Sequence, residues 1–113
     1  MNFLISNKKL YISKFKKNLK LNNYILYYDK IFHTFKNKNK KYYIIGNIYG
    51  IKDGLFSKIN AEKKIITKNF NHLLGRYVVI EIYNQNINIF SDTTGRVDLF
   101  YILDKKKLII STI

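Results

Sequence analysis

Few side chains in this chain could do chemistry, and the sequence does not space them to act together. There is no cysteine, so thiolate nucleophiles, thiolate metal ligands and disulfides are all excluded. The hydroxyls of Ser91, Thr93 and Thr94 have no base partner that would activate them. His33 and His72 have no nearby carboxylate or second histidine at metal-ligand spacing, so both are predicted to be structural or exposed. The sequence therefore predicts neither a metal site nor a cofactor.

The acidic residues give one local pattern. Asp92 heads an Asp-Thr-Thr-Gly run that ends at Gly95. An aspartate at the head of a turn can hydrogen-bond to the backbone that follows it, and glycine supplies a positive φ angle. The run therefore predicts a turn, and a ligand-binding role for Asp92 is the less favoured alternative. The only glutamates, Glu62 and Glu81, could join an acid–base pair only through contacts between distant segments.

The formal net charge of +14 raises the question of a nucleic-acid partner, because clustered basic side chains neutralise phosphates. The densest basic run offers a candidate surface made of Lys36, Lys38, Lys40 and Lys41. All but Arg76 and Arg96 of the 21 basic residues are lysines, although arginine is preferred for bidentate phosphate contacts. Abundant lysine, isoleucine and asparagine without proline also fit an AT-rich genome. We therefore favour a solvated lysine surface over a nucleic-acid face.

Length and composition predict one folded domain over residues 1–113. The chain is 47% hydrophobic and 16% aromatic, which is too rich in core-forming residues for disorder. No stretch approaches the roughly 18 consecutive apolar residues of a membrane-spanning helix. The N-terminus has no small-residue cleavage site typical of a signal peptide, so a cytoplasmic location is predicted.

Alternation of apolar and polar residues indicates strands along most of the chain. The first half is predicted to form strands at residues 2–6, 9–13, 24–28, 30–35 and 42–50, the first two joined as a hairpin by Asn7 and Lys8. The continuous apolar run at 42–50 suggests burial on both faces. Residues 14–21 fit either a short amphipathic helix or a charged connection, and the lysine run at 36–41 is predicted to be an exposed loop.

The second half is predicted to contain one short helix followed by two hairpins. Asn60 is a plausible N-cap for the helix. Strands at 76–83 and 86–91 flank the two-residue loop Asn84-Gln85, and strands at 99–103 and 108–112 flank a polar loop. The sequence thus predicts an α+β fold that is mostly antiparallel β-structure with one or two short helices.

One face of the strand at 76–83 is predicted to lie in the core. Residues two apart share a face of a strand, so Tyr77, Val79 and Glu81 should point one way. The other face is expected to be buried with Ile44 and Ile48, and it consists of Val78, Ile80 and Ile82.

Residues 42–113, and 73–112 most of all, resemble the class II glutamine amidotransferase domain of the asparagine synthetase family, which has an Ntn-type fold. The resemblance rests on a leucine-glycine pair, the Asp-x-x-Gly turn, an aromatic strand and a final serine: Leu74, Gly75, Asp92, Gly95, Leu99, Phe100, Tyr101 and Ser111. Gly46, Ile48 and Tyr49 also match the strand that lines the glutamine site in that family. The resemblance implies part of an Ntn-type amidotransferase sheet.

The positions that the family uses for chemistry differ here. Asn2 stands where active members expose the nucleophilic cysteine after methionine removal, and asparagine cannot replace a thiolate. Ile45 stands where the family has the asparagine that donates to the oxyanion, and Asn47 where it has the glutamate that holds the substrate amino group. Asp92 matches the aspartate that contacts this amino group, but Ser91 and Asp98 replace the family's arginine and proline. The resemblance therefore implies a domain without glutaminase activity.

Relatives without the cysteine, such as β-lactam synthetases and lasso-peptide cyclases, keep the domain as a scaffold beside an ATP-dependent synthetase domain. The resemblance implies a non-catalytic module that binds a protein partner, either a synthetase-like enzyme or a C-terminal region of its own chain. An open sheet edge could also pair two copies of the chain. The alternative is a basic protein that binds single-stranded nucleic acid with a lysine-rimmed aromatic sheet.

Overall fold

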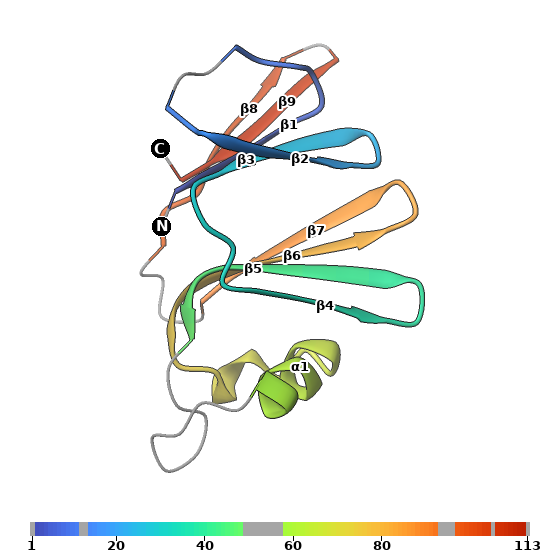
Figure 1. Ribbon diagram of the computed structural model, residues 1–113, viewed down its shortest axis with the longest axis vertical. Helices are drawn as coiled ribbons and strands as arrows, with labels where there is room; N and C mark the ends of the chain where they lie inside the picture. Colours follow the sequence, from blue (N-terminus) through green and yellow to red (C-terminus); the bar gives the residue numbers. More distant parts are fainter. Residues whose placement is uncertain (1, 12–13, 49–57, 93–96, 105, 113) are drawn as a thin grey trace.

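The computed structural model describes residues 2–11, 14–48, 58–92, 97–104 and 106–112. In these residues the chain forms two antiparallel sheets and one α-helix (Figure 1). The strands are β1 (Phe3–Ser6), β2 (Lys17–Leu21), β3 (Tyr24–Tyr28), β4 (His33–Asn37), β5 (Lys40–Ile48), β6 (Gly75–Tyr83), β7 (Asn86–Ser91), β8 (Phe100–Asp104) and β9 (Lys107–Ser111). The helix α1 spans Lys58–Ile66, and a 3-10 turn, η1, spans Phe70–His72. The predicted α+β class with mostly antiparallel strands is confirmed.

The two sheets pack face to face. One has the strand order β2-β3-β1-β9-β8 and the other β4-β5-β6-β7. Figure 1 shows α1 against the four-stranded sheet, on the side away from the five-stranded sheet. The described residues contain no helix long and apolar enough to cross a membrane.

The predicted hairpin between residues 2–6 and 9–13 is wrong. Residues 9–11 form no strand, residues 12 and 13 lie outside the described part, and β1 pairs with β3 and β9 instead. Ile5 is fully buried between Leu26 and Ile110, its partners on the two neighbouring strands. Asn7 ends β1 because its side chain binds the β8–β9 connection, donating to the Lys106 carbonyl at 2.7 Å.

Two lysine-rich segments also differ from the prediction. Residues 17–21 are neither helix nor connection but strand β2, which pairs with β3. The predicted loop at 36–41 is instead the end of β4, a two-residue turn at Lys38 and Asn39, and the start of β5. Long lysine stems can lie along a sheet while their ammonium groups reach water, so a lysine run does not prevent strand pairing.

Several local predictions are confirmed. The hairpin of β6 and β7 turns at Asn84 and Gln85, and Asn84 has the positive φ of 55° that such a turn requires. β8 pairs with β9, and β3 covers the predicted strand at 24–28.

The predicted strand at 30–35 begins only at His33. The helix is present, but it begins at Lys58, so Asn60 lies inside it and is not its N-cap.

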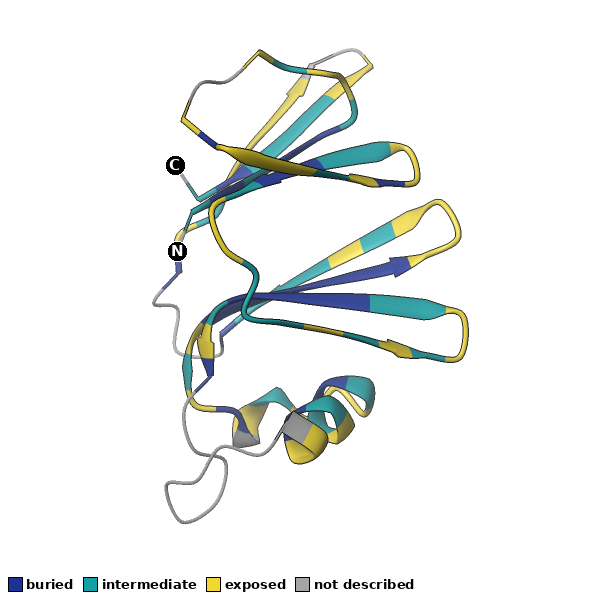
Figure 2. Ribbon diagram, in the orientation of Figure 1, coloured by how far each residue is buried: buried dark blue, intermediate teal, exposed yellow. Residues whose placement is uncertain are grey.

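The core consists of one cluster on each face of the four-stranded sheet. The cluster between the sheets includes Phe3 and Ile5 of β1 with Val78, Ile80 and Ile82 of β6. Figure 2 shows burial along most of β6, as expected for a strand covered on both faces. The assignment of alternate residues to two faces is therefore confirmed.

The prediction that Val78, Ile80 and Ile82 are buried with Ile44 and Ile48 of β5 is wrong, because the two sets lie on opposite faces of the sheet. The antiparallel register places Ile44 opposite Val79 and Ile45 opposite Val78. Directly opposite residues share a face, so Val78 packs with Ile45 between the sheets, while Ile44 packs in the second cluster. That second cluster lies between the sheet and α1 and contains Tyr42, Ile44, Ile48, Ala61, Ile65, Leu73, Tyr77 and Val79.

Candidate functional site

A small cavity lies where the resemblance implies the glutamine site. Its described lining residues are Asn2, just before β1, Gly46 and Asn47 of β5, and Asp29 and Lys30, which follow β3. Its volume is about 180 Å³, below the roughly 300–1,000 Å³ of typical ligand pockets. The described lining offers amide, carboxylate and ammonium groups, which can hold water or a small polar group by hydrogen bonds.

The backbone of β5 and β6 approaches closely beside this cavity. Gly46 has a φ of 101° and lies opposite Tyr77 in the sheet. Gly75 has a φ of 137°, and a Cβ atom there would lie 2.2 Å from the carbonyl oxygen of Asn47. Only glycine fits at this position. The two glycines therefore shape the strand pair next to Asn47.

Asp92 is not among the described residues that line this cavity. Asp92 is buried after β7, and its backbone N–H donates to the carbonyl of Tyr77 at 3.1 Å. Burial, and then the negative charge of Asp92, raise the pKa of the Tyr77 hydroxyl to about 12. Of the candidate residues, Gly46 and Asn47 thus meet Asn2, while Asp92 lies beside Tyr77. Gly95 lies outside the described residues.

The four candidate lysines meet in a larger cleft. Lys36, Lys38, Lys40 and Lys41 of the β4–β5 hairpin line it together with Lys20 of β2, and we call it the lysine cleft. Its volume is about 430 Å³, and its remaining described lining residues are Leu21, Asn22, Asn39, Tyr43, Ile82 and Asn84. In Figure 1 the turns of the β2–β3, β4–β5 and β6–β7 hairpins all lie at this side of the molecule. The fold therefore concentrates positive charge at one end of the two sheets.

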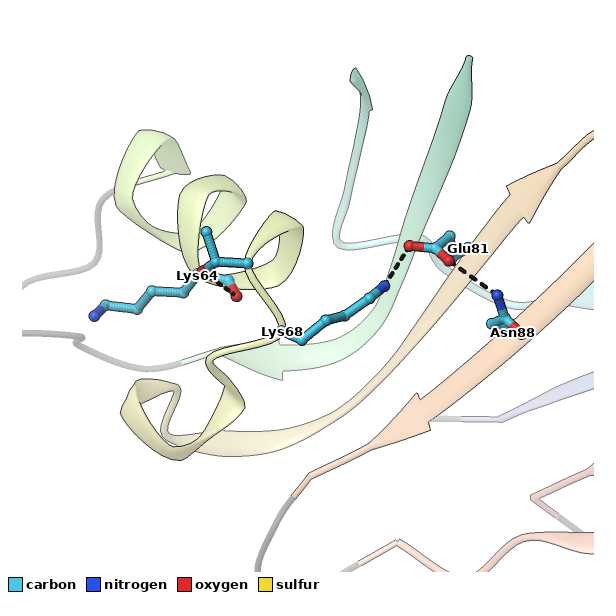
Figure 3. A network of polar contacts seen from close by, with 5 residues as sticks. Lys64, Lys68, Glu81 and Asn88 are labelled. Atoms are coloured by element: carbon cyan, nitrogen blue, oxygen red, sulfur yellow. Dashed lines mark hydrogen bonds and ion pairs between the residues drawn. The ribbon is translucent and has the colours of Figure 1, made fainter. Parts of the chain in front are cut away.

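A buried network of charged and polar side chains lies on the helix side of the four-stranded sheet. The sequence pattern did not predict this network. The Glu81 carboxylate is 2% exposed, pairs with the Lys68 ammonium and accepts from the Asn88 amide at 2.9 Å (Figure 3). Burial alone would raise the pKa of Glu81, but hydrogen bonds from Lys68, Asn88 and Tyr42 and the charge of Lys68 outweigh it and lower that pKa. Burial, with the hydrogen bond and charge of Glu81, raises the pKa of Tyr42 to about 12.

His33 has the carboxylate neighbour that its sequence context did not indicate. Its Nε2 atom lies 3.1 Å from Oε1 of Glu62 on α1, so the expectation of no nearby carboxylate is corrected. The pair joins β4 to α1 across 29 positions of sequence, which periodicity cannot reveal. The side chain of His72 lies outside the described part. No group of three or more metal-ligating residues forms within the described ranges.

The edge strand β8 is the most exposed apolar segment described. Phe100, Tyr101, Ile102 and Leu103 are 57%, 76%, 57% and 70% exposed. β8 pairs with β9 on one side, and in the described strand order it forms an edge of the five-stranded sheet. Both alternating sets of side chains are therefore open to solvent.

No protein-family model, curated protein or solved structure matches this chain.

Proposed function

We propose that this chain is a non-catalytic, amidotransferase-like module that binds a protein partner through β8. The partner is an asparagine-synthetase-like, ATP-dependent enzyme that forms amides on a sugar or peptide, or closes a peptide macrolactam. The observation that carries the proposal is the exposure of four consecutive large apolar side chains on an edge strand.

The two faces of β8 explain why a partner, rather than solvent, suits this strand. Tyr101 lies opposite Ile110, and Ile110 lies opposite Ile5 in the fully buried centre of the sheet. The row of side chains across these three strands therefore changes from fully buried at Ile5 to largely exposed at Tyr101. An added strand would pair with the backbone edge of β8 that no other described strand occupies and would cover both rows, the arrangement called β-augmentation.

Two observations support a scaffold role and this class of partner. The cavity at Asn2, Gly46 and Asn47 is small, and the chain has no thiol that could attack glutamine. The order of β6, β7, β8 and β9 along the chain carries the resemblance to amidotransferase domains, which accompany synthetase domains.

Site-specific photo-cross-linking in the cells that make the protein tests the proposal. A benzophenone amino acid replaces Tyr101, which is 76% exposed on β8, or Tyr11, which is 94% exposed outside the sheets. We expect position 101, and not position 11, to cross-link to a protein that mass spectrometry identifies as carrying a synthetase domain with a Ser-Gly-Gly-x-Asp-Ser pyrophosphate loop.

Three outcomes would contradict the proposal. Equal cross-linking from both positions would show unspecific contact. A product containing two copies of this chain would assign β8 to self-association. A partner without a synthetase domain would refute the proposed enzyme class.

A further inference from the structure

We infer that the lysine cleft binds a compact polyphosphate anion. Both sheets contribute lysines to the lining of the cleft, because Lys20 belongs to the five-stranded sheet and the other four lysines to the β4–β5 hairpin. No carboxylate occurs among its described lining residues. This inference is independent of the binding proposed for β8.

The fold brings like charges together here without neutralising them. Lys36 lies directly opposite Lys41 in the β4–β5 pair, where like charges repel each other and destabilise the sheet. Within the described residues, the ion pairs are His33–Glu62 and Lys68–Glu81, so none of the five cleft lysines is paired. A bound anion would remove this repulsion and gain attraction from both sheets at once.

The shape of the cleft favours a small anion. Its volume of about 430 Å³ falls within the usual range of ligand pockets, roughly 300–1,000 Å³. Lysine ammonium groups bind phosphate as point charges, and asparagine amides in the wall can donate further hydrogen bonds. Asn22 donates to the Asn84 carbonyl, which ties the β2–β3 turn to the β6–β7 turn and fixes one wall of the cleft.

The aromatic residue of the cleft argues against recognition of nucleic-acid bases. Tyr43 is buried in the core between the sheets, and the Lys41 ammonium lies over its ring, 5.2 Å from the centroid. Single-stranded nucleic-acid sites present aromatic rings on which bases stack. The ring of Tyr43 is buried and is also covered by the Lys41 ammonium, so no base can stack on it. The cleft therefore offers charged groups and amides rather than a stacking platform.

Calorimetric titration with inorganic tripolyphosphate tests the inference. We expect saturable binding with one site per chain that weakens as potassium chloride is added, because salt screens the attraction. Lys36→Glu should weaken this binding about tenfold or more, since it places a carboxylate inside the cleft. It should not unfold the protein, because the new carboxylate faces Lys41 and replaces a repulsive pair by an attractive one.

Lys16→Glu is the matched control. It makes the same change in net charge at an exposed residue just before β2, at the end of that strand away from the cleft. We expect less than about a twofold change in affinity, as for a distant screened charge. An equal loss in both variants would show attraction by net charge alone and would overturn the inference, as would the absence of saturable binding by the unmodified protein.

Titration with single-stranded oligodeoxythymidylate tests whether the cleft binds a compact polyphosphate or the phosphates of a nucleic-acid strand. We expect it to bind more weakly than tripolyphosphate at equal phosphate concentration and to be displaced by it. Tighter binding of the oligonucleotide with the same dependence on Lys36 would assign the cleft to a nucleic-acid strand and overturn the compact ligand.

Discussion

Lys68, in the turn after α1, places its ammonium on the buried carboxylate of Glu81 near the C-terminal end of β6, 13 positions further along the chain. The Lys68 side chain is 40% exposed and its ammonium also lies 4.3 Å from the ring centroid of Phe90. Lys68 thus neutralises a buried charge and links the C-terminal end of α1 to the four-stranded sheet.

Removing the Lys68 charge should destabilise the fold. Lys68→Met keeps an apolar stem over Phe90 but leaves the Glu81 carboxylate buried without its cation. We expect the free energy of unfolding, measured by urea denaturation, to fall by about 1–3 kcal/mol. The loss should lie toward the lower end of this range because Lys68 is partly solvated. Lys63→Met on exposed helix surface is the control and should cost under about 0.5 kcal/mol. Equal losses would show that the pair contributes nothing specific.

The lowered pKa of Glu81 predicts a particular pH dependence. A carboxyl group whose pKa is lower in the folded state stabilises the fold above its unfolded pKa, near its ordinary value of 4.5. That contribution is lost as the pH falls through the folded-state pKa. The stability advantage of the unmodified protein over Glu81→Gln should therefore be constant above about pH 6 and shrink below about pH 4.5. An advantage that grows on acidification would contradict the assigned direction.

Ile80 should be essential to the core between the sheets. It is fully buried in the cluster that joins β6 to β1, so Ile80→Ala should cost about 2–5 kcal/mol through lost burial and the cavity that remains. Ile102→Ala on the exposed strand β8 deletes the same atoms where solvent already reaches them and should cost under about 0.5 kcal/mol. Chemical denaturation of both variants measures the difference, and similar costs would refute the face assignment.

Adding a nucleophile alone should not produce glutaminase activity. Asn2→Cys places a thiol beside Gly46 and Asn47 in the small cavity, but the buried side chain of Ile45 has no group that could donate to an oxyanion. We expect no release of glutamate from glutamine above a buffer blank, either by the unmodified protein or by this variant. Turnover that persists through a second purification would contradict the non-catalytic proposal.

The sequence predicted elements whose signals are local and missed those set by distant contacts. The β6–β7 hairpin was predictable because Asn84 and Gln85 separate two alternating runs. The place of β1 was not, because its partner β9 lies at the other end of the chain, where the Phe3 N–H donates to Thr112 Oγ1 at 3.0 Å. Strand β2 was missed because its polar residues, Lys17, Asn18 and Lys20, outnumber Leu19 and Leu21, which carry the alternation.

The candidate sites divide in the same way. Gly46 and Asn47 are close because they are neighbours in one strand, whereas Asp92 reaches Tyr77 through pairing across β6 and β7. The lysines at 36–41 were visible as a charge run, but Lys20 joins them only because two sheets meet. The ion-pair partners of Glu81 and His33 come from segments 13 and 29 positions away, and no period in the sequence encodes such contacts.

The affinity of this chain for the synthetase-like enzyme tests the central claim most directly. Isothermal titration should compare the unmodified protein with Tyr101→Lys, which puts a charge on β8, and with Tyr11→Lys, the same change at an exposed tyrosine elsewhere. The account predicts that Tyr101→Lys weakens the Kd about tenfold or more without lowering the melting temperature, and that Tyr11→Lys changes neither value. An unchanged Kd in Tyr101→Lys, or an equal loss in both variants, would contradict docking through β8.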